Sequence, residues 1–105
     1  MHITQQRDTV SLAGDLDLQC WTEVRDCLLQ VLRDKNCVVV NVSQVQYVDS
    51  QGLGAILAVI RTAHDAGLGR DAVVLRGPRR RVLRLVEMSA IDRLVQVQDP
   101  EQTTA

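Results

Sequence analysis

The chain has 105 residues, a length that fits one domain of about 100 to 200 residues. Its residues are 46% hydrophobic and 24% charged, as in an ordinary globular protein. With one Trp, one Tyr and no Phe, it lacks the aromatic platforms that stack single-stranded nucleic acid, and its net charge of −1 gives no basic field for a phosphate backbone. We therefore expect no direct nucleic-acid partner.

The N-terminal segment MHITQQRDTV has neither a basic leader nor an apolar stretch, so no signal peptide is expected. No apolar run is long enough to span a bilayer, so no membrane insertion is expected. Cys20, Cys27 and Cys37 are an odd number of cysteines without CxxC spacing. We expect buried, reduced thiols in a cytoplasmic protein and no metal site, and a redox role for the thiols stays open.

The first elements in the chain are two short alternating segments. They flank Arg7-Asp8, which is typical of a turn, so residues 1–14 predict a β-hairpin. The sequence GDLD at 14–17 predicts the end of a strand and the start of a helix, because aspartate is favoured at helix caps. Apolar residues at helical spacing then predict a helix over 18–34.

The rest of the chain alternates strands with helices. The β-branched run CVVVNV at 37–42 predicts a strand buried on both faces. A helix follows from Ser50 to about Ala66, with Gly67 in the left-handed position after its end. The last predicted elements are a strand at 72–76, a helix with Pro78 in its first turn, a strand at 94–98 and a polar tail at 99–105.

The predicted fold is a single α/β domain over residues 1–98 with the order β-β-α-β-α-β-α-β. Short connections between strands and helices predict right-handed crossovers and a mixed sheet covered by helices. The loops that leave parallel strands gather at one edge of such a sheet, where ligands usually bind. We therefore expect Ser50 to lie near Asp15 and Asp17, with Arg79, Arg80 and Arg81 on another side.

The sequence YVDSQGLGAIL at 47–57 leaves two uses open for its serine. Asp49 or Ser50 can cap the helix, which stabilises it by about 1 kcal/mol, and Gly52 and Gly54 then allow close packing on the sheet. Yet each glycine costs a helix about 1 kcal/mol relative to alanine, so two in the first turn favour a contact surface. Ser50 can also accept a phosphate, since free amides and the positive end of the helix dipole favour an anion there.

Nucleophilic catalysis by Ser50 is not expected. The only histidines are His2 and His64, and His64 lies near the far end of the same predicted helix, about 20 Å away at 1.5 Å per residue. The G-x-S-x-G nucleophile elbow is also absent.

Four segments of the chain carry a resemblance to a known family: GDLD at 14–17, VVVNVSQVQYVDSQGLGAIL at 38–57, VLRGPRRRVLRLVEM at 74–88 and SAIDRLV at 89–95. With these segments the chain resembles the STAS domain family, and within it the bacterial anti-sigma factor antagonists, from Val10 to Val97. Asp-Ser-x-Gly-Leu-Gly at 49–54 is the most specific part of the resemblance. The chain departs from the family at three positions: Asn41 stands where Asp is frequent, Gln51 stands where Ser or Ala is frequent, and Ala90 replaces a glycine, which we expect to affect a turn.

The resemblance implies a non-enzymatic partner switch. The unphosphorylated antagonist binds an anti-sigma factor that is also a serine kinase, which frees the sigma factor. Phosphorylation of the serine matching Ser50 ends this binding, and a PP2C-type phosphatase resets it. ATP and magnesium would come with the kinase, because this chain has no phosphate-binding loop and is expected to hold no cofactor.

Partner binding is expected around the phosphorylated serine, with Gln51 tuning which kinase is recognised. Arg79, Arg80 and Arg81 are either a solvated helix face or a docking patch. STAS domains also act as accessory subunits of ABC-type lipid transporters, and that adaptor role stays open as the alternative. The expected partner-binding residues are Asp15, Asp17, Asp49, Gln51, Gly52, Leu53, Gly54 and Leu57.

Overall fold

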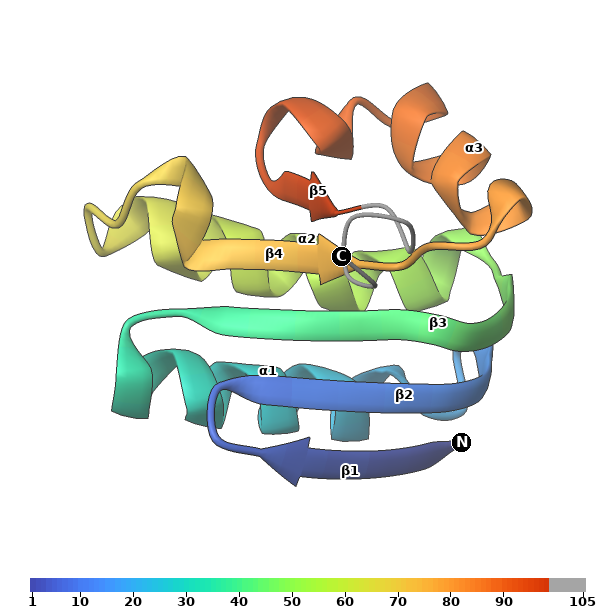
Figure 1. The fold of residues 1–105 in the computed structure, drawn as a ribbon, viewed down its shortest axis with the longest axis horizontal. Coiled ribbons are helices and arrows are strands. Elements are labelled where there is room, and N and C mark those ends of the chain that lie inside the picture. Colours follow the sequence, from blue (N-terminus) through green and yellow to red (C-terminus); the bar gives the residue numbers. More distant parts are fainter. Residues whose placement is uncertain (99–105) are drawn as a thin grey trace.

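The computed structural model describes residues 1–98, so the predicted tail at 99–105 lies outside the described residues. The elements follow one another in the predicted order (Figure 1). The strands are β1 (His2–Gln6), β2 (Thr9–Leu16), β3 (Val38–Val48), β4 (Val73–Arg76) and β5 (Gln96–Gln98). The helices are α1 (Trp21–Lys35), α2 (Ser50–Asp65) and α3 (Arg80–Met88), with short 3₁₀ helices η1 (Arg70–Ala72) and η2 (Ile91–Arg93).

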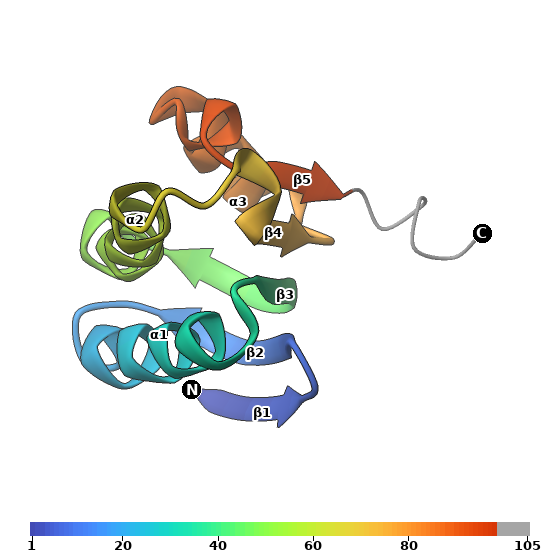
Figure 2. The same cartoon turned by 90° about the vertical axis from the view of Figure 1, so that its left-hand side faces the viewer.

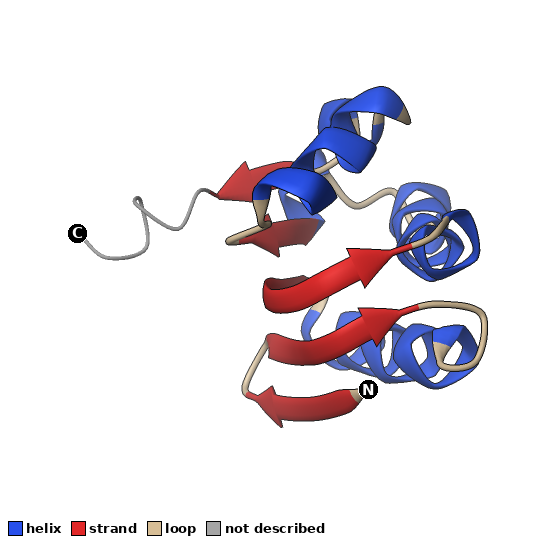
Figure 3. Cartoon of the chain, turned by 90° about the vertical axis from the view of Figure 1, so that its right-hand side faces the viewer, coloured by secondary structure: helices blue, strands red, loops and turns tan. Residues whose placement is uncertain are grey.

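The five strands form one mixed sheet in the order β1-β2-β3-β4-β5, which confirms the predicted fold class. β1 pairs antiparallel with β2, and each later neighbour is parallel. α1 and α2 lie side by side over one face of the sheet (Figure 2). Figure 3 shows the opposite view, from the side on which β2 and β3 end and their loops lead into α1 and α2.

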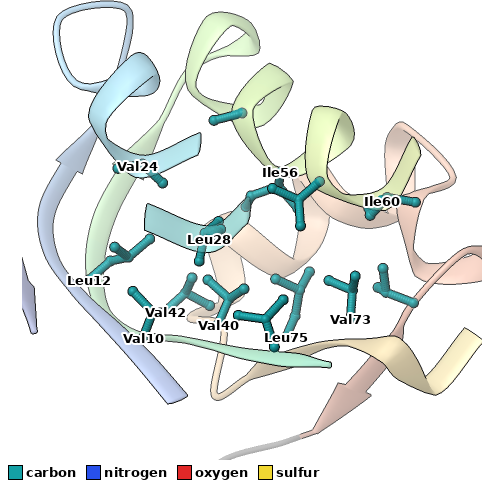
Figure 4. Packing of buried hydrophobic residues seen from close by; sticks show 14 of the residues in the cluster. Val10, Leu12, Val24, Leu28, Val40, Val42, Ile56, Ile60, Val73 and Leu75 are labelled. Atoms are coloured by element: carbon teal, nitrogen blue, oxygen red, sulfur yellow. The ribbon is translucent and has the colours of Figure 1, made fainter. Parts of the chain in front are cut away.

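The core between the sheet and these two helices is aliphatic. Figure 4 shows Leu28 of α1 and Ile56 of α2 pointing toward the valines and leucines of β2, β3 and β4. Val10, Leu28 and Val40 are fully buried there. Because few aromatic side chains are present, branched aliphatic residues fill this space and set the distance between helices and sheet.

β3 is longer than predicted: it has 11 residues and ends at Val48, whereas the sequence pattern indicated residues 37–42. The pattern along the added residues is disturbed by two irregularities in the pairing with β2, between Ser11 and Ala13 and between Gly14 and Asp15. At each of them β3 has one residue more than β2. Val42 and Val45 are consequently both buried although they lie three residues apart, so the usual alternation of a strand is lost.

The start of α1 also differs from the prediction, because the helix begins at Trp21 and not at residue 18. Residues 17–20 form a turn in which the Cys20 N–H donates to the Asp17 carbonyl at 3.2 Å. The Asp17 carboxylate accepts from the Gln19 N–H at 3.0 Å, so it caps this turn and does not cap α1. Cys20, without a capping side-chain bond, is the N-cap of the helix.

α3 begins later than predicted, since Pro78 precedes the N-cap residue Arg79. Gly77, with a φ of +67°, donates its N–H to the Gln98 carbonyl at 2.7 Å. This bond joins the loop before α3 to β5. Gly77 and Pro78 are both buried in that loop, outside the helix. β5 is shorter than predicted, and Gly67 has the expected left-handed conformation with a φ of +77°.

α3 packs against β3, which pairs with β4 only from Val38 to Asn41. Beyond these four pairs, the Arg79 Nε donates to the Ser43 carbonyl of β3 at 3.0 Å. This side chain therefore satisfies a backbone carbonyl on a part of the strand edge that β4 does not cover.

Ala90 lies in a turn, as predicted, and has a left-handed backbone with a φ of 61° and a ψ of 16°. A non-glycine residue pays about 1–2 kcal/mol for this conformation. Ala90 is exposed, so a glycine would lose no packing there.

We predict that Ala90→Gly raises the free energy of unfolding by about 0.5–1 kcal/mol, after allowing for the greater entropy of glycine in the unfolded chain. The measurement is urea denaturation followed by circular dichroism. Ala66→Gly is the matched control. Because Ala66 has a φ of −82°, glycine relieves no strain there and should lower the free energy of unfolding. Equal destabilisation by both changes would contradict the prediction.

Candidate functional site

Asp49 and Ser50 have different roles at the start of α2. The Asp49 side chain is the N-cap and accepts from the Gly52 N–H at 2.7 Å, while its carbonyl accepts from the Leu53 N–H at 3.0 Å. Ser50 is exposed, and its hydroxyl has no hydrogen-bond partner within residues 1–98. Because Asp49 supplies the cap, the Ser50 hydroxyl is left available to a partner.

The first turn of α2 lies directly against the end of β2. The Asp49 N–H donates to the Leu16 carbonyl at 3.2 Å. A Cβ added to Gly52 would lie 2.1 Å from the same carbonyl oxygen, a distance that no real side chain adopts. Gly52 is therefore required for this packing. Gly54 has nothing within 4 Å of an added Cβ, so only the first of the two glycines serves close packing.

Carboxylates from two neighbouring strand ends gather beside Ser50, as expected. Asp15 lies opposite Tyr47 in the parallel pairing of β2 and β3, and Leu16 lies opposite Val48. Asp15 is exposed, and Asp17 and Asp49 are half-buried. The structure thus brings together the three predicted acidic residues at the edge where Ser50 is presented.

Cys20 holds this edge together, a role that the sequence pattern did not reveal. Its thiol accepts from the Asp17 N–H at 3.4 Å and lies within donating distance of the Asp15 carbonyl, also at 3.4 Å. The buried sulfur therefore links the end of β2 to the turn that carries Asp17. No spacing rule identifies such a role, because it depends on the path of the turn.

Two exposed apolar side chains flank the acidic residues and were also missed. Leu18 is 59% exposed and Tyr47 is 54% exposed. The apolar spacing places Leu18 in the first helix, whereas that helix begins at Trp21. The irregular pairing of β2 and β3 makes the exposure of Tyr47 unpredictable from an alternating pattern. Exposed apolar groups beside carboxylates are suited to protein contact, because their burial against a partner is favourable.

The exposed face of α2 runs from Ser50 through Gly54, Leu57 and Arg61 to His64, at spacings of four and three residues. Leu57 is 37% exposed, whereas Leu53 is only 5% exposed. Gly52 and Leu53 are predicted partner contacts, but both are buried inside the fold. Gln51 is exposed, as is His64, which lies at the other end of α2.

Arg79, Arg80 and Arg81 are exposed at the start of α3. Arg79 is engaged with the Ser43 carbonyl of β3. Within residues 1–98 no hydrogen bond or ion pair joins these arginines to Ser50 or to the acidic residues beside it. A docking role for them stays a prediction.

Comparison with known proteins agrees with this architecture. The family model described as "Mlab, STAS domain" matches residues 1–96. The chain belongs to the STAS domain family. A curated relative, the anti-sigma F factor antagonist of Paenibacillus polymyxa, is 31% identical over 94 residues, which cover 88% of this chain and 78% of the relative.

Solved structures share the fold of this STAS domain. Protein TM1081 of Thermotoga maritima has a TM-score of 0.75 at 22% identity, covering 93% of this chain and 85% of that one. The Bacillus cell fate determinant SpoIIAA in its phosphorylated form has a TM-score of 0.65 at 17% identity, covering 98% and 95%. The anti-sigma factor antagonist SpoIIAA in its unphosphorylated form has a TM-score of 0.61 at 20% identity, covering 89% and 96%.

The other two thiols of the STAS domain lie away from Ser50 and are half-buried, so the expected burial holds fully only for Cys20. Burial, and then the charge of Glu23, raise the pKa of the Cys27 thiol. Burial and Asp8 raise the pKa of Cys37, whose thiol donates to the Asp8 carboxylate at 3.7 Å. A raised pKa leaves less of the reactive thiolate at neutral pH.

Within residues 1–98 there is no group of three or more His, Cys, Asp or Glu side chains placed to hold a metal ion. Of the helices in that range, none is both long and apolar enough to cross a membrane.

We predict opposite effects for the two glycines of α2. Gly52→Ala should lower the free energy of unfolding by about 2–3 kcal/mol, because the new methyl group must displace α2 from the Leu16 carbonyl. Gly54→Ala should raise it by up to about 1 kcal/mol, because alanine favours the helix and meets open space. Chemical denaturation of both variants measures the difference. Similar stability changes for the two would contradict the packing described here.

Proposed function

We propose that this STAS domain is an anti-sigma factor antagonist switched by phosphorylation of Ser50. The unphosphorylated form binds an anti-sigma factor serine kinase and so releases the sigma factor. Phosphorylation ends this binding, and a PP2C-type phosphatase restores it. The observation that carries the proposal is the exposed, unbonded Ser50 hydroxyl beside an Asp49 that already caps α2.

The known relatives support a role of this kind. The Paenibacillus polymyxa relative is named an anti-sigma F factor antagonist and matches most of both chains. SpoIIAA, which has a similar fold, is described in both an unphosphorylated and a phosphorylated form. A phosphate on Ser50 of this chain would correspond to the second of these states.

The surroundings of Ser50 explain how a phosphate would act without unfolding the chain. Asp49 holds the cap through its own carboxylate, so modification of Ser50 leaves that bond in place. A phosphate adds a charge of about −1.5 to −2 at neutral pH. With Asp15 and Asp17 nearby, the added charge makes burial of this edge against a partner more costly, since desolvation and like-charge repulsion both oppose it.

The proposed role is regulatory and not catalytic. The Ser50 hydroxyl has no basic side chain within hydrogen-bonding distance in the described part of the chain. His64 lies at the opposite end of α2, and His2 lies on β1, which β2 separates from β3. The phosphate donor, ATP with magnesium, would be bound by the partner kinase.

The adaptor role in an ABC-type lipid transporter is the second candidate, and the match to the "Mlab, STAS domain" family model keeps it open. In that role Ser50 need not be phosphorylated. The two candidates therefore differ in one measurable property, the phosphate on Ser50 in cells.

We predict that protein isolated from its own host carries one phosphate, which maps to Ser50 and is absent from Ser50→Ala. Intact-mass spectrometry and phosphopeptide mapping measure the phosphate. Thr22→Ala is the control for Ser50→Ala, since Thr22 is an exposed hydroxyl in the first turn of α1, and it should leave the phosphate in place.

We predict that Ser50→Asp binds the kinase at least about tenfold more weakly than the unmodified protein, because it adds charge at the contact.

Absence of phosphate under all growth and stress conditions would overturn the switch. Co-purification of a transporter ATPase with the wild-type protein would then favour the adaptor role.

We predict that Leu57→Ala weakens kinase binding about fivefold or more, because Leu57 is the exposed apolar side chain on the same face of α2 as Ser50. Titration calorimetry against the purified kinase measures the affinity. Met88→Ala is the control, since Met88 is 81% exposed on α3. Normal binding by Leu57→Ala with unchanged stability would remove this part of α2 from the contact.

A further inference from the structure

A cavity of about 390 Å³ lies at the end of α2 opposite to Ser50. Its walls come from three elements: the second half of α2, the segment around η1, and η2. Ile60 and Val73, seen together at one end of the core in Figure 4, belong to its inner wall. The volume is within the range of about 300–1,000 Å³ that is usual for small-molecule sites.

The inner wall and the rim of this cavity are largely apolar. Ile60 and Val73 are 7% and 2% exposed, so they form a floor continuous with the hydrophobic core. Leu57 and Leu94 at the rim are 37% and 53% exposed. Filling the cavity with an apolar group would remove this exposed surface from water, which is favourable.

The polar residues that line the cavity are all basic: Arg61, His64, Arg70 and Arg93. No carboxylate side chain lines it. Within residues 1–98 the only ion pair joins Arg25 to Asp26, so Arg61 and Arg93 have no carboxylate partner in that range. An apolar cavity with two arginines at its rim that have no carboxylate partner is complementary in charge to an anion.

Arg70 shows that the wall is built and not a chance gap between loops. Its Nε donates to the Val95 carbonyl at 3.2 Å, and its Nη2 donates to the Asp92 carbonyl at 3.0 Å. These two bonds join η1 to the segment around η2, and both segments contribute residues to the lining of the cavity. Two of the three lining segments are therefore held together by the fold itself.

We propose that this cavity binds a small molecule with an apolar body and a single anionic head group, a carboxylate or a phosphate. The apolar body contacts Ile60, Val73 and Leu94, and the head group lies at Arg61 and Arg93. Arg61 is 11 residues after Ser50 on the same helix, about 16 Å along its axis, so the cavity is separate from the phosphorylation site. The proposal does not depend on the proposed switch.

The test is a titration of methyl-labelled protein by NMR. Decanoate and decyl phosphate are the probes, decan-1-ol is the neutral probe with the same chain, and acetate is the head group alone. We expect decanoate, decyl phosphate or both to shift the methyl signals of Leu57, Ile60, Leu68 and Leu94 in a saturable way. Acetate should have no effect, and decan-1-ol should bind about tenfold more weakly than the better anion. The comparison of the two anions identifies the preferred head group.

Arg61→Glu with Arg93→Glu should weaken binding of the anion about tenfold or more, because both rim cations become anions. Arg33→Glu, an exposed change of the same charge on α1, is the matched control and should bind normally. Thermal melting of each variant establishes that it is folded, and Arg61→Gln with Arg93→Gln replaces the double variant if it is not.

The proposal is overturned if neither anion gives saturable shifts at the cavity methyl groups. It is also overturned if decan-1-ol binds as tightly as the anions, or if the charge-reversed variant binds like wild type. Shifts of the same methyl signals on dilution without any ligand would show a second copy of the chain in the cavity, and would equally overturn it. None of these outcomes changes whether Ser50 is phosphorylated, so the two proposals fail independently.

Discussion

The contact between Gly52 and the Leu16 carbonyl oxygen determines where α2 begins relative to the sheet. Since a Cβ at residue 52 would lie 2.1 Å from that oxygen, the first turn can approach β2 only with glycine. The Asp49 N–H bonds to the same carbonyl. These two interactions place Ser50 beside the strand end that carries Asp15, and the rest of the site follows from that position.

At the start of α2 the capping residue and the free hydroxyl belong to two different side chains. Asp49 binds the Gly52 amide, and Ser50 is free on the exposed side of the same turn. A chemical change at Ser50 can therefore alter the surface without removing the bond that stabilises the helix. This separation is the structural condition for a switch that acts through recognition and not through unfolding.

One face of α2 connects two chemically different regions. Its first turn lies at the edge of the sheet that carries the carboxylates and the exposed side chains of Leu18 and Tyr47. Its last turns line an apolar cavity with a basic rim. Leu57 lies between them and contributes to both. A ligand in the cavity and a partner on the first half of α2 would thus share a side chain, which gives a physical route by which one could influence the other.

By itself the sequence determined the order of the elements, the mixed sheet and the position of Ser50 at a helix start. These depend on local preferences: β-branched runs, helical spacing of apolar residues and the Asp-Ser-x-Gly pattern. The same local signals predicted that Asp15, Asp17 and Asp49 lie at one edge, because parallel strands end together.

Only the tertiary structure decided the features that depend on pairing between strands. The two irregularities between β2 and β3 change which side chains of β3 face the core, so neither its length nor the exposure of Tyr47 follows from an alternating pattern. The roles of Gly52, Cys20 and Arg79 depend on carbonyl or amide groups distant in sequence or fixed by a turn. The cavity likewise depends on three segments distant in sequence, the second half of α2, the segment around η1 and the segment around η2, and no single one of them carries a signal for it.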